Sequence, residues 1–254
     1  MDVKNYYRAT SVEDAYRKLK EDPKNAILAG GLWLKKLNAK VETLIDMENV
    51  GLNCIEDLGD SIRVGAMVSQ REFETNESIK GLLNGSVAFS TREIMGPAFR
   101  NMATIGGSVY GRYPFSDVIC GLLMMDVELE FYPEMKMSLQ DYLSYKGKVD
   151  GILKYINIKK ENGKGYFKKV KTTALDFPLI NFGISKRDGK YYIVVGSRPM
   201  VASYATKAME AANNGVSFDE VAKIAAEEFS YADSTTVSAE YRKDLVKVYV
   251  RRGL

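Results

Sequence analysis

The sequence predicts an α+β fold in two parts: a larger mixed region through about residue 150, then a small unit in which helices back an antiparallel sheet. Short strand and helix patterns alternate in the first part. In the second, four strand patterns at hairpin spacing precede three helical patterns. A chain of 254 residues, 46% hydrophobic and 27% charged, has the size and composition for packed cores of this kind.

In the first part, apolar spacing and capping residues place the elements. Thr10 and Ser11 are candidate N-caps, and Ser69 with Glu72 forms a capping box. Gly30 and Gly31 fall at a strand-to-helix junction. The expected elements are a strand over 5–8, a helix over 12–19, a buried strand over 26–29, a helix over 32–37, strands over 43–46 and 61–66, a short helix after 69 and a helix over 85–95.

Gly96 and Pro97 end that helix, and the small, polar segment 98–116 has the composition of a loop. Between 133 and 150 the pattern weakens, so we place the domain boundary there, with parts 1–150 and 151–254. Asp188 and Gly189 mark a hairpin turn. The remaining expected elements are a helix over 118–125 opened by Asp117, strands over 127–131, 152–158, 165–172, 179–185 and 191–196, and helices over 204–212, 218–229 and 239–250.

The absence of histidine excludes every mechanism that needs an imidazole base, ligand or attachment point. Two distant cysteines, Cys54 and Cys120, cannot form a four-thiolate cluster; we interpret both as buried apolar residues. The formal net charge of +3 identifies no partner. No segment resembles a signal peptide or a membrane span, so we expect a cytoplasmic protein without metal ligands of its own.

Two glycine pairs, Gly30-Gly31 and Gly106-Gly107, are candidate phosphate-binding loops because glycine lets backbone amides approach an anion closely. A lone pair is more often only a tight turn, and no G-x-G-x-x-G motif supports a Rossmann site. Thr104 and Ser108 add hydroxyl groups beside the second pair. Asp117 could equally be an N-cap, and Lys168, with Lys169 and Lys171 beside it, could belong to a solvated face.

Several segments, taken in order, resemble the flavin-binding subunits and domains of the molybdenum hydroxylases, a family that includes xanthine dehydrogenases and the medium subunit of carbon monoxide dehydrogenase. The resemblance covers nearly the whole chain and rests on ILAGGLWLKKL, ETLIDMENV, IRVGAMVSQREFE, AFRNMATIGGSVYGRYPFSDVICGLLMMDVELEF and DGILKYINIK. It implies a two-part FAD-binding domain of the vanillyl-alcohol-oxidase (PCMH-like) type, followed by that family's small C-terminal domain.

The resemblance also implies the residues that bind non-covalent FAD. The first loop would be Ile27, Leu28, Ala29, Gly30, Gly31, Leu32 and Trp33, and the second Thr104, Gly106, Gly107 and Ser108, with Asp117, Leu153 and Lys168 as further contacts. Leu32 and Trp33 depart from the family, which usually has polar residues there. Trp33 either fills the core or stacks on the cofactor. Ser108 stands where Asn is usual, and Thr172 where arginine is common.

By resemblance, the chain is an oxidoreductase subunit that relays electrons from a [2Fe–2S] subunit, itself fed by a molybdopterin subunit, to NAD or another acceptor. The alternative is a structural scaffold subunit that has lost FAD. A loop over 112–115 would either dock the iron–sulfur subunit or cover the flavin. A nucleic-acid site is disfavoured, because we expect its basic residues to form one solvated helix face: Arg242, Lys243, Lys247, Arg251 and Arg252.

Overall fold

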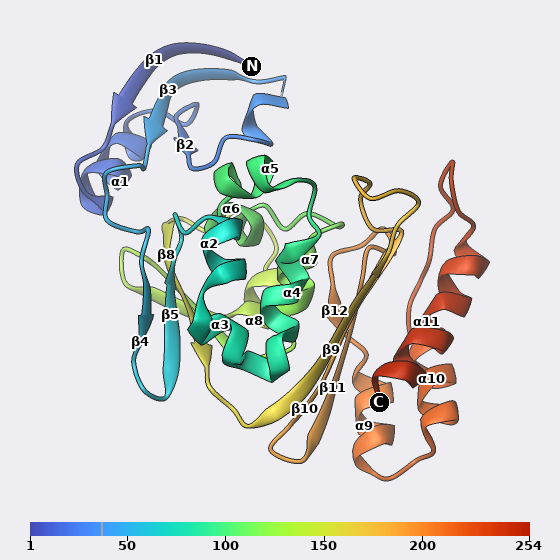
Figure 1. Ribbon diagram of the computed structural model, residues 1–254. Helices are drawn as coiled ribbons and strands as arrows, with labels where there is room; N and C mark the ends of the chain where they lie inside the picture. Colours follow the sequence, from blue (N-terminus) through green and yellow to red (C-terminus); the bar gives the residue numbers. More distant parts are fainter. Residues whose placement is uncertain (37) are drawn as a thin grey trace. The chain divides into compact units, whose positions relative to one another are not determined.

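The computed structural model describes residues 1–36 and 38–254. Its contacts divide the chain into two compact units: the first comprises 1–73, 97–111 and 127–158, and the second 74–96, 112–126 and 159–254. Each unit combines helices with sheet (Figure 1), so the predicted α+β class is confirmed. The boundary between residues 150 and 151 stays a prediction. No helix in the described ranges is both long and apolar enough to cross a bilayer.

The first unit begins with a parallel three-stranded sheet in the order β1-β3-β2. These strands are β1 (Asp2–Arg8), β2 (Ala26–Leu28) and β3 (Lys40–Asp46), and α1 (Val12–Glu21) connects β1 to β2. The Ser11 hydroxyl caps α1 by accepting the Asp14 amide at 3.1 Å, as the sequence predicts. The prediction that residues 26–29 form a buried strand is wrong in one respect: β2 is an edge strand and only half-buried.

A five-stranded sheet forms the rest of the first unit's framework, in the order β4-β5-β8-β6-β7. Its strands are β4 (Ile55–Asp57), β5 (Ser61–Gly65), β6 (Val127–Tyr132), β7 (Met135–Ser138) and β8 (Ile152–Lys159). The prediction had placed 152–158 in the C-terminal sheet, but β8 pairs antiparallel with β6. Sequence spacing suggested a hairpin with the next strand; the apolar register with β6 decides the pairing instead.

Short helices cover this framework: α2 (Gln70–Thr75), α5 (Pro97–Met102), α6 (Ile105–Tyr110) and α8 (Leu139–Ser144). The predicted capping box forms, with the Glu72 carboxylate accepting the Ser69 amide at 2.8 Å and the Ser69 hydroxyl accepting the Glu72 amide at 3.1 Å. The prediction of a loop over 98–116 is wrong, because α5 and α6 lie within it. The glycine-rich composition of the segment suggested a loop, but short helices can form where caps and tertiary contacts stabilise them.

The second unit is built on an antiparallel sheet in the order β12-β11-β10-β9. Asp188 and Gly189, both with positive φ, join β10 to β11 in the predicted turn. The strands are β9 (Gly163–Val170), β10 (Ile180–Arg187), β11 (Lys190–Gly196) and β12 (Ser203–Tyr204), and the helices are α3 (Glu77–Gly81), α4 (Ser86–Arg92), α7 (Asp117–Leu122), α9 (Thr206–Asn213), α10 (Phe218–Glu227) and α11 (Ala239–Gly253), with the 3₁₀ turn η2 (Leu82–Gly85).

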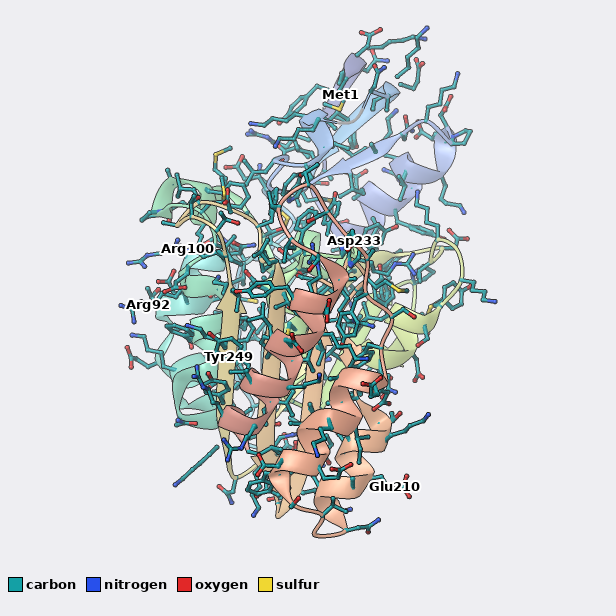
Figure 2. The ribbon with its side chains drawn as sticks, turned by 90° about the vertical axis from the view of Figure 1, so that its right-hand side faces the viewer. Met1, Arg92, Arg100, Glu210, Asp233 and Tyr249 are labelled. Carbon is teal, nitrogen blue, oxygen red and sulfur yellow. The ribbon has the colours of Figure 1, made fainter. Side chains whose placement is uncertain are left out.

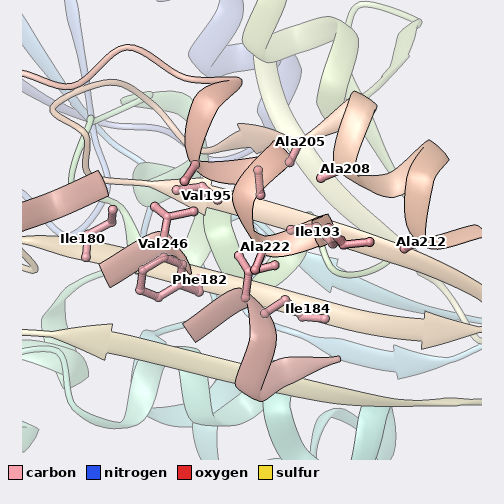
Figure 3. Close-up of a cluster of buried hydrophobic side chains, with 14 residues drawn as sticks. Ile180, Phe182, Ile184, Ile193, Val195, Ala205, Ala208, Ala212, Ala222 and Val246 are labelled. Carbon is pink, nitrogen blue, oxygen red and sulfur yellow. The ribbon is translucent and has the colours of Figure 1, made fainter. Parts of the chain in front are cut away.

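One face of this sheet is covered by α9, α10 and α11 (Figure 2). Glu210 on α9 is exposed, whereas Tyr249 on α11 packs against the core beneath the helices. Between these helices and the sheet lies an apolar core (Figure 3), in which Phe182 and Ile193 on the strands meet alanines such as Ala208 and Ala222 on the helices. Small helix residues let the helices approach the sheet closely. On the other face, the Ser185 hydroxyl donates to the carbonyl of Met124, just after α7, at 2.8 Å.

Candidate functional site

The first glycine loop follows β2 at the edge of the parallel sheet. Ile27 and Leu28 pair with β3, and half-buried residues 29–33 then lead into the 3₁₀ turn η1 (Leu34–Lys36). This turn is shorter than the predicted helix over 32–37, whose last position, residue 37, lies outside the described residues. The Gly31 carbonyl accepts the Lys35 amide at 3.2 Å, and the Trp33 carbonyl accepts the Lys36 amide at 3.0 Å.

Three successive amides in this loop are free to bind a ligand. Gly31 has a φ of +69°, a conformation that glycine adopts without strain. Within residues 1–36 and 38–254, the amides of Gly30, Gly31 and Leu32 have no hydrogen-bond acceptor. Consecutive unsatisfied amides in a turn form a concavity that suits an anion.

The structure brings the two predicted loops together within the first unit. A Cβ built on Gly30 would overlap the Met102 carbonyl oxygen and lie 3.2 Å from Ala103 Cα, just before the second loop. Only glycine therefore permits the first loop to lie directly against the backbone that leads into α6.

The second loop forms the N-terminal half of α6, and its amides bond within the protein. The Ile105 amide donates to the Val68 carbonyl at 2.9 Å, the Gly106 amide to the Ala66 carbonyl at 3.0 Å, and the Gly107 amide to the Thr104 hydroxyl at 3.0 Å. Thr104 is thus a buried N-cap. These bonds hold the loop in place. Residues 103–106 are buried, and Gly107 is the exposed residue of the loop.

Ser108 is half-buried beside Gly107 and belongs to a side-chain network. Its hydroxyl donates to the Thr104 carbonyl at 2.7 Å and accepts from Gln70 Nε2 at 3.0 Å. The other side-chain atom of Gln70, Oε1, is buried and has no partner in the described chain. A buried acceptor without a hydrogen-bond partner is unusual in folded proteins. Gln70 Oε1 is therefore a polar atom close to the second loop that could accept a hydrogen bond from a ligand.

Asp117, in the second unit, is buried with only 5% of its surface exposed and forms an ion pair. Lys169 Nζ lies 3.0 Å from its Oδ2, and Asn181 Nδ2 donates to its Oδ1 at 2.8 Å. Burial raises the pKa of Asp117, because desolvation outweighs the attraction of Lys169; burial likewise lowers the pKa of Lys169. Asp117 is not the N-cap of α7, since the Ser116 hydroxyl accepts the Ile119 amide there.

Sequence reasoning missed Lys169 and Asn181 as the partners of Asp117. Strand β9 alternates, so Lys168 and Lys169 point to opposite faces of the sheet. Lys168 is half-buried with its Nζ 5.9 Å from the Tyr249 ring, whereas the side chain of Lys169 is 1% exposed. The expectation of a solvated face is therefore wrong for Lys169. A strict count of inward positions along β9 would have shown a buried lysine that needs a carboxylate partner.

Three other expectations can be compared with the structure. Leu153 is buried in β8 opposite Phe131 within the first unit, whereas Lys168 belongs to the second. Trp33 is half-buried and does not fill the core; Lys36 Nζ lies 4.7 Å from its ring centroid. Cys120 is buried as expected, but Cys54 is only partly buried.

The basic C-terminal residues do not form one solvated face. Arg242 is 6% exposed, and its guanidinium donates to the carbonyls of Leu179 and Ser197. Arg242, on α11, thus satisfies backbone acceptors next to the ends of β10 and β11 that the protein would otherwise bury unpaired.

A family described as the FAD binding domain in molybdopterin dehydrogenase matches residues 2–158. The chain belongs to this family. Nearly the whole chain is similar to FAD-binding and medium subunits of known enzymes. The xanthine dehydrogenase FAD-binding subunit of Escherichia coli O157:H7 is 23% identical over 279 residues, covering 99% of this chain and 94% of that protein. The nicotine 6-hydroxylase medium subunit of Paenarthrobacter nicotinovorans is 29% identical over 274 residues, covering 98% and 95%.

Solved structures share the fold of this FAD-binding family member. Carbon monoxide dehydrogenase from Hydrogenophaga pseudoflava superposes with a TM-score of 0.90 at 19% identity, covering 98% of this chain and 95% of that one. Quinoline 2-oxidoreductase from Pseudomonas putida 86 gives a TM-score of 0.87 at 19% identity, covering 98% and 94%. The resemblance inferred from the glycine loops is confirmed, and FAD is the cofactor of the family.

The residues of the first unit fit the diphosphate of FAD. The amides of Gly30, Gly31 and Leu32 supply donors that no described protein group uses. The close approach at Gly30 holds this loop against the segment that carries Thr104 and Ser108. Backbone amides and hydroxyls of this kind bind phosphate oxygens without requiring a charged side chain.

Proposed function

We propose that this chain is the FAD-binding electron-relay subunit of a molybdopterin-dependent dehydrogenase or hydroxylase. The observation that carries the proposal is the loop at residues 30–32, whose three amides have no acceptor in the described part of the chain. This loop lies against the segment that leads into the second glycine pair, in a chain of this family. When bound, FAD supplies the redox chemistry, since flavins accept and release electrons singly or in pairs.

In this proposal, the chain's own residues bind and orient the cofactor. The first loop (27–33) holds the diphosphate through its backbone, and the second presents the exposed Gly107 with the Ser108 hydroxyl beside it. Asp117 accepts a hydrogen bond from the cofactor while Lys169 and Asn181 fix its two oxygens. A carboxylate has lone pairs enough for a third donor. Leu153 and Lys168 remain the proposed apolar and basic contacts.

Electrons reach this subunit from a [2Fe–2S] subunit, supplied in turn by a molybdopterin subunit, and pass to NAD or another acceptor. Relatives named as FAD-binding and medium subunits support this division of labour. The docking loop over 112–115 is pre-organised: the rings of Tyr113 and Phe115 stack at 5.4 Å, Phe115 contacts Phe177 at 4.4 Å, and the Pro114 carbonyl accepts the Ser197 amide at 3.1 Å. Fixed aromatic rings suit an interface core.

The test is the visible spectrum and the activity of the purified chain. We expect oxidised-flavin absorbance, at most NADH:dye oxidoreductase activity, and no hydroxylation of a purine or aldehyde. Co-expression with the genes next to its own should yield a complex with the iron–sulfur and molybdopterin subunits. A colourless protein that ignores added FAD would support the scaffold alternative, which the apolar residues Leu32 and Trp33 favour. Unaided hydroxylation would refute the relay role.

A further inference from the structure

We propose that Lys36, held over the indole of Trp33, supplies the positive charge that the first glycine loop presents to the FAD diphosphate. This inference rests on the proposed function and deepens it. It assigns a purpose to Trp33, which with Leu32 departs from the family's pattern in the first loop: the tryptophan ring holds the lysine that supplies the missing polar contact.

The first loop (27–33) has no charged side chain. The residues that follow Gly31 are Leu32, whose side chain has no donor, and Trp33, whose one donor is the uncharged indole N–H. A diphosphate carries negative charge that uncharged amides neutralise only in part, and a cation nearby strengthens such hydrogen bonds. The loop therefore needs a charge from elsewhere.

Lys36 is placed to provide it. The bond from its amide to the Trp33 carbonyl, 3.0 Å long, sets the turn so that its side chain returns over the tryptophan. Lys36 Nζ lies 4.7 Å from the ring centroid, within the range of about 6 Å for a cation–π contact. Lys36 is exposed, and no carboxylate in the described ranges lies within ion-pair distance of its Nζ.

The ring contact matters because it restricts a flexible side chain. A free lysine must be ordered when it meets a phosphate, whereas one that already rests on an aromatic face loses less conformational freedom. The adjacent Lys35 supplies a natural comparison. It belongs to the same turn, is equally exposed, and makes no ring contact among the described residues.

Trp33 also makes the proposal measurable, because it is the only tryptophan in the chain. All tryptophan fluorescence therefore arises from the first loop, within three residues of the free amides. FAD bound there should quench this emission. The signal reports occupancy of this loop independently of flavin colour or enzyme activity.

The experiment titrates FAD into the full-length flavin-free protein and into Lys36→Gln, Lys35→Gln and Lys36→Arg variants, following tryptophan emission and confirming the affinity by equilibrium dialysis. Losing one charge-assisted hydrogen bond should weaken FAD binding about 10- to 100-fold in Lys36→Gln. Lys36→Arg keeps the charge and can keep the ring contact, so it should retain affinity to within about threefold. Lys35→Gln should do so too, because Lys35 makes no ring contact among the described residues. ADP, which carries the diphosphate without the flavin, should lose affinity for Lys36→Gln by a similar factor.

The possible results separate the two proposals. If the unaltered chain binds no FAD by dialysis, the proposed function fails and this inference fails with it. If FAD binds but Lys36→Gln and Lys35→Gln weaken it equally, or Lys36→Gln leaves it unchanged, only the role of Lys36 is overturned. FAD binding without any change in tryptophan emission would likewise overturn it. A weaker dependence of affinity on sodium chloride in Lys36→Gln alone would support it.

Discussion

The buried pair of Asp117 and Lys169 allows a quantitative test of how the second unit is stabilised. Replacing Lys169 by Met leaves a buried carboxylate for which Asn181 is the one remaining donor among residues 1–36 and 38–254. Breaking a buried ion pair in this way costs about 3–5 kcal/mol. For a chain of this size, that corresponds to a fall of about 6–20 °C in melting temperature.

The double variant Asp117→Asn/Lys169→Met should be more stable than either single variant. It removes both charges and keeps an amide oxygen for the Asn181 donor. Replacing both members of a buried pair is often close to neutral, so we expect a loss of about 1 kcal/mol. Lys168→Met, on the same strand but the opposite face, is the matched control and should change stability little.

Urea unfolding followed by circular dichroism and by fluorescence would measure the stability of the unaltered protein and of the four variants: Lys169→Met, Asp117→Asn, the double variant and Lys168→Met. The pH dependence has a definite sign. Burial holds the pKa of Asp117 above its ordinary value, so the native state binds the extra proton. The contribution of this proton to the free energy of unfolding is then fully present at low pH and is lost as the pH rises through the pKa of Asp117 in the folded state. In Lys169→Met this loss should grow, so that acid partly restores the variant. Additive effects of the two single changes would refute the coupling.

Three further outcomes are expected. Gly30→Ala should abolish FAD binding because its methyl would overlap the Met102 carbonyl, whereas Gly81→Ala, with open space around it, should not. Burial raises the pKa of Tyr204 to about 12, so stability should fall by about 2 kcal/mol as pH rises from 10 to 12, an effect absent in Tyr204→Phe. Acid precipitation should leave flavin in the supernatant; colour retained in the pellet but released in Cys54→Ser would indicate a covalent bond to Cys54.

Caps and apolar periodicity made much of the fold predictable. Ser11, Ser69 with Glu72, and the turn at Asp188 act through bonds within a few residues, and each forms as the sequence predicts. The failures concern long-range choices. Strand β8 follows the apolar register of β6, and α6 owes its stability to the carbonyls of Ala66 and Val68. These partners are distant in the sequence, so the local pattern does not show them. For α6, composition alone therefore suggested a loop.

The candidate site was predictable at its backbone and less so at its side chains. Glycine pairs reveal where chain segments approach closely, and the contact of Gly30 with Met102 is of that kind. A lysine's environment depends on which face of a strand it occupies, and a shift of one position exchanges Lys168 for Lys169. Asn181 is 64 residues from Asp117, and no local signal connects them.

The two glycine pairs look alike in sequence, yet their hydrogen bonds differ. The amides of Gly106 and Gly107 bond to Ala66 and Thr104, so substitutions there act first on the fold: a Cβ at Gly107 would lie 2.9 Å from the Thr104 hydroxyl and disturb the cap. The amides of Gly30 and Gly31 have no such partners in the described chain. Cofactor affinity should therefore respond most directly to changes around the first loop, where Leu32 and Trp33 depart from the family's pattern.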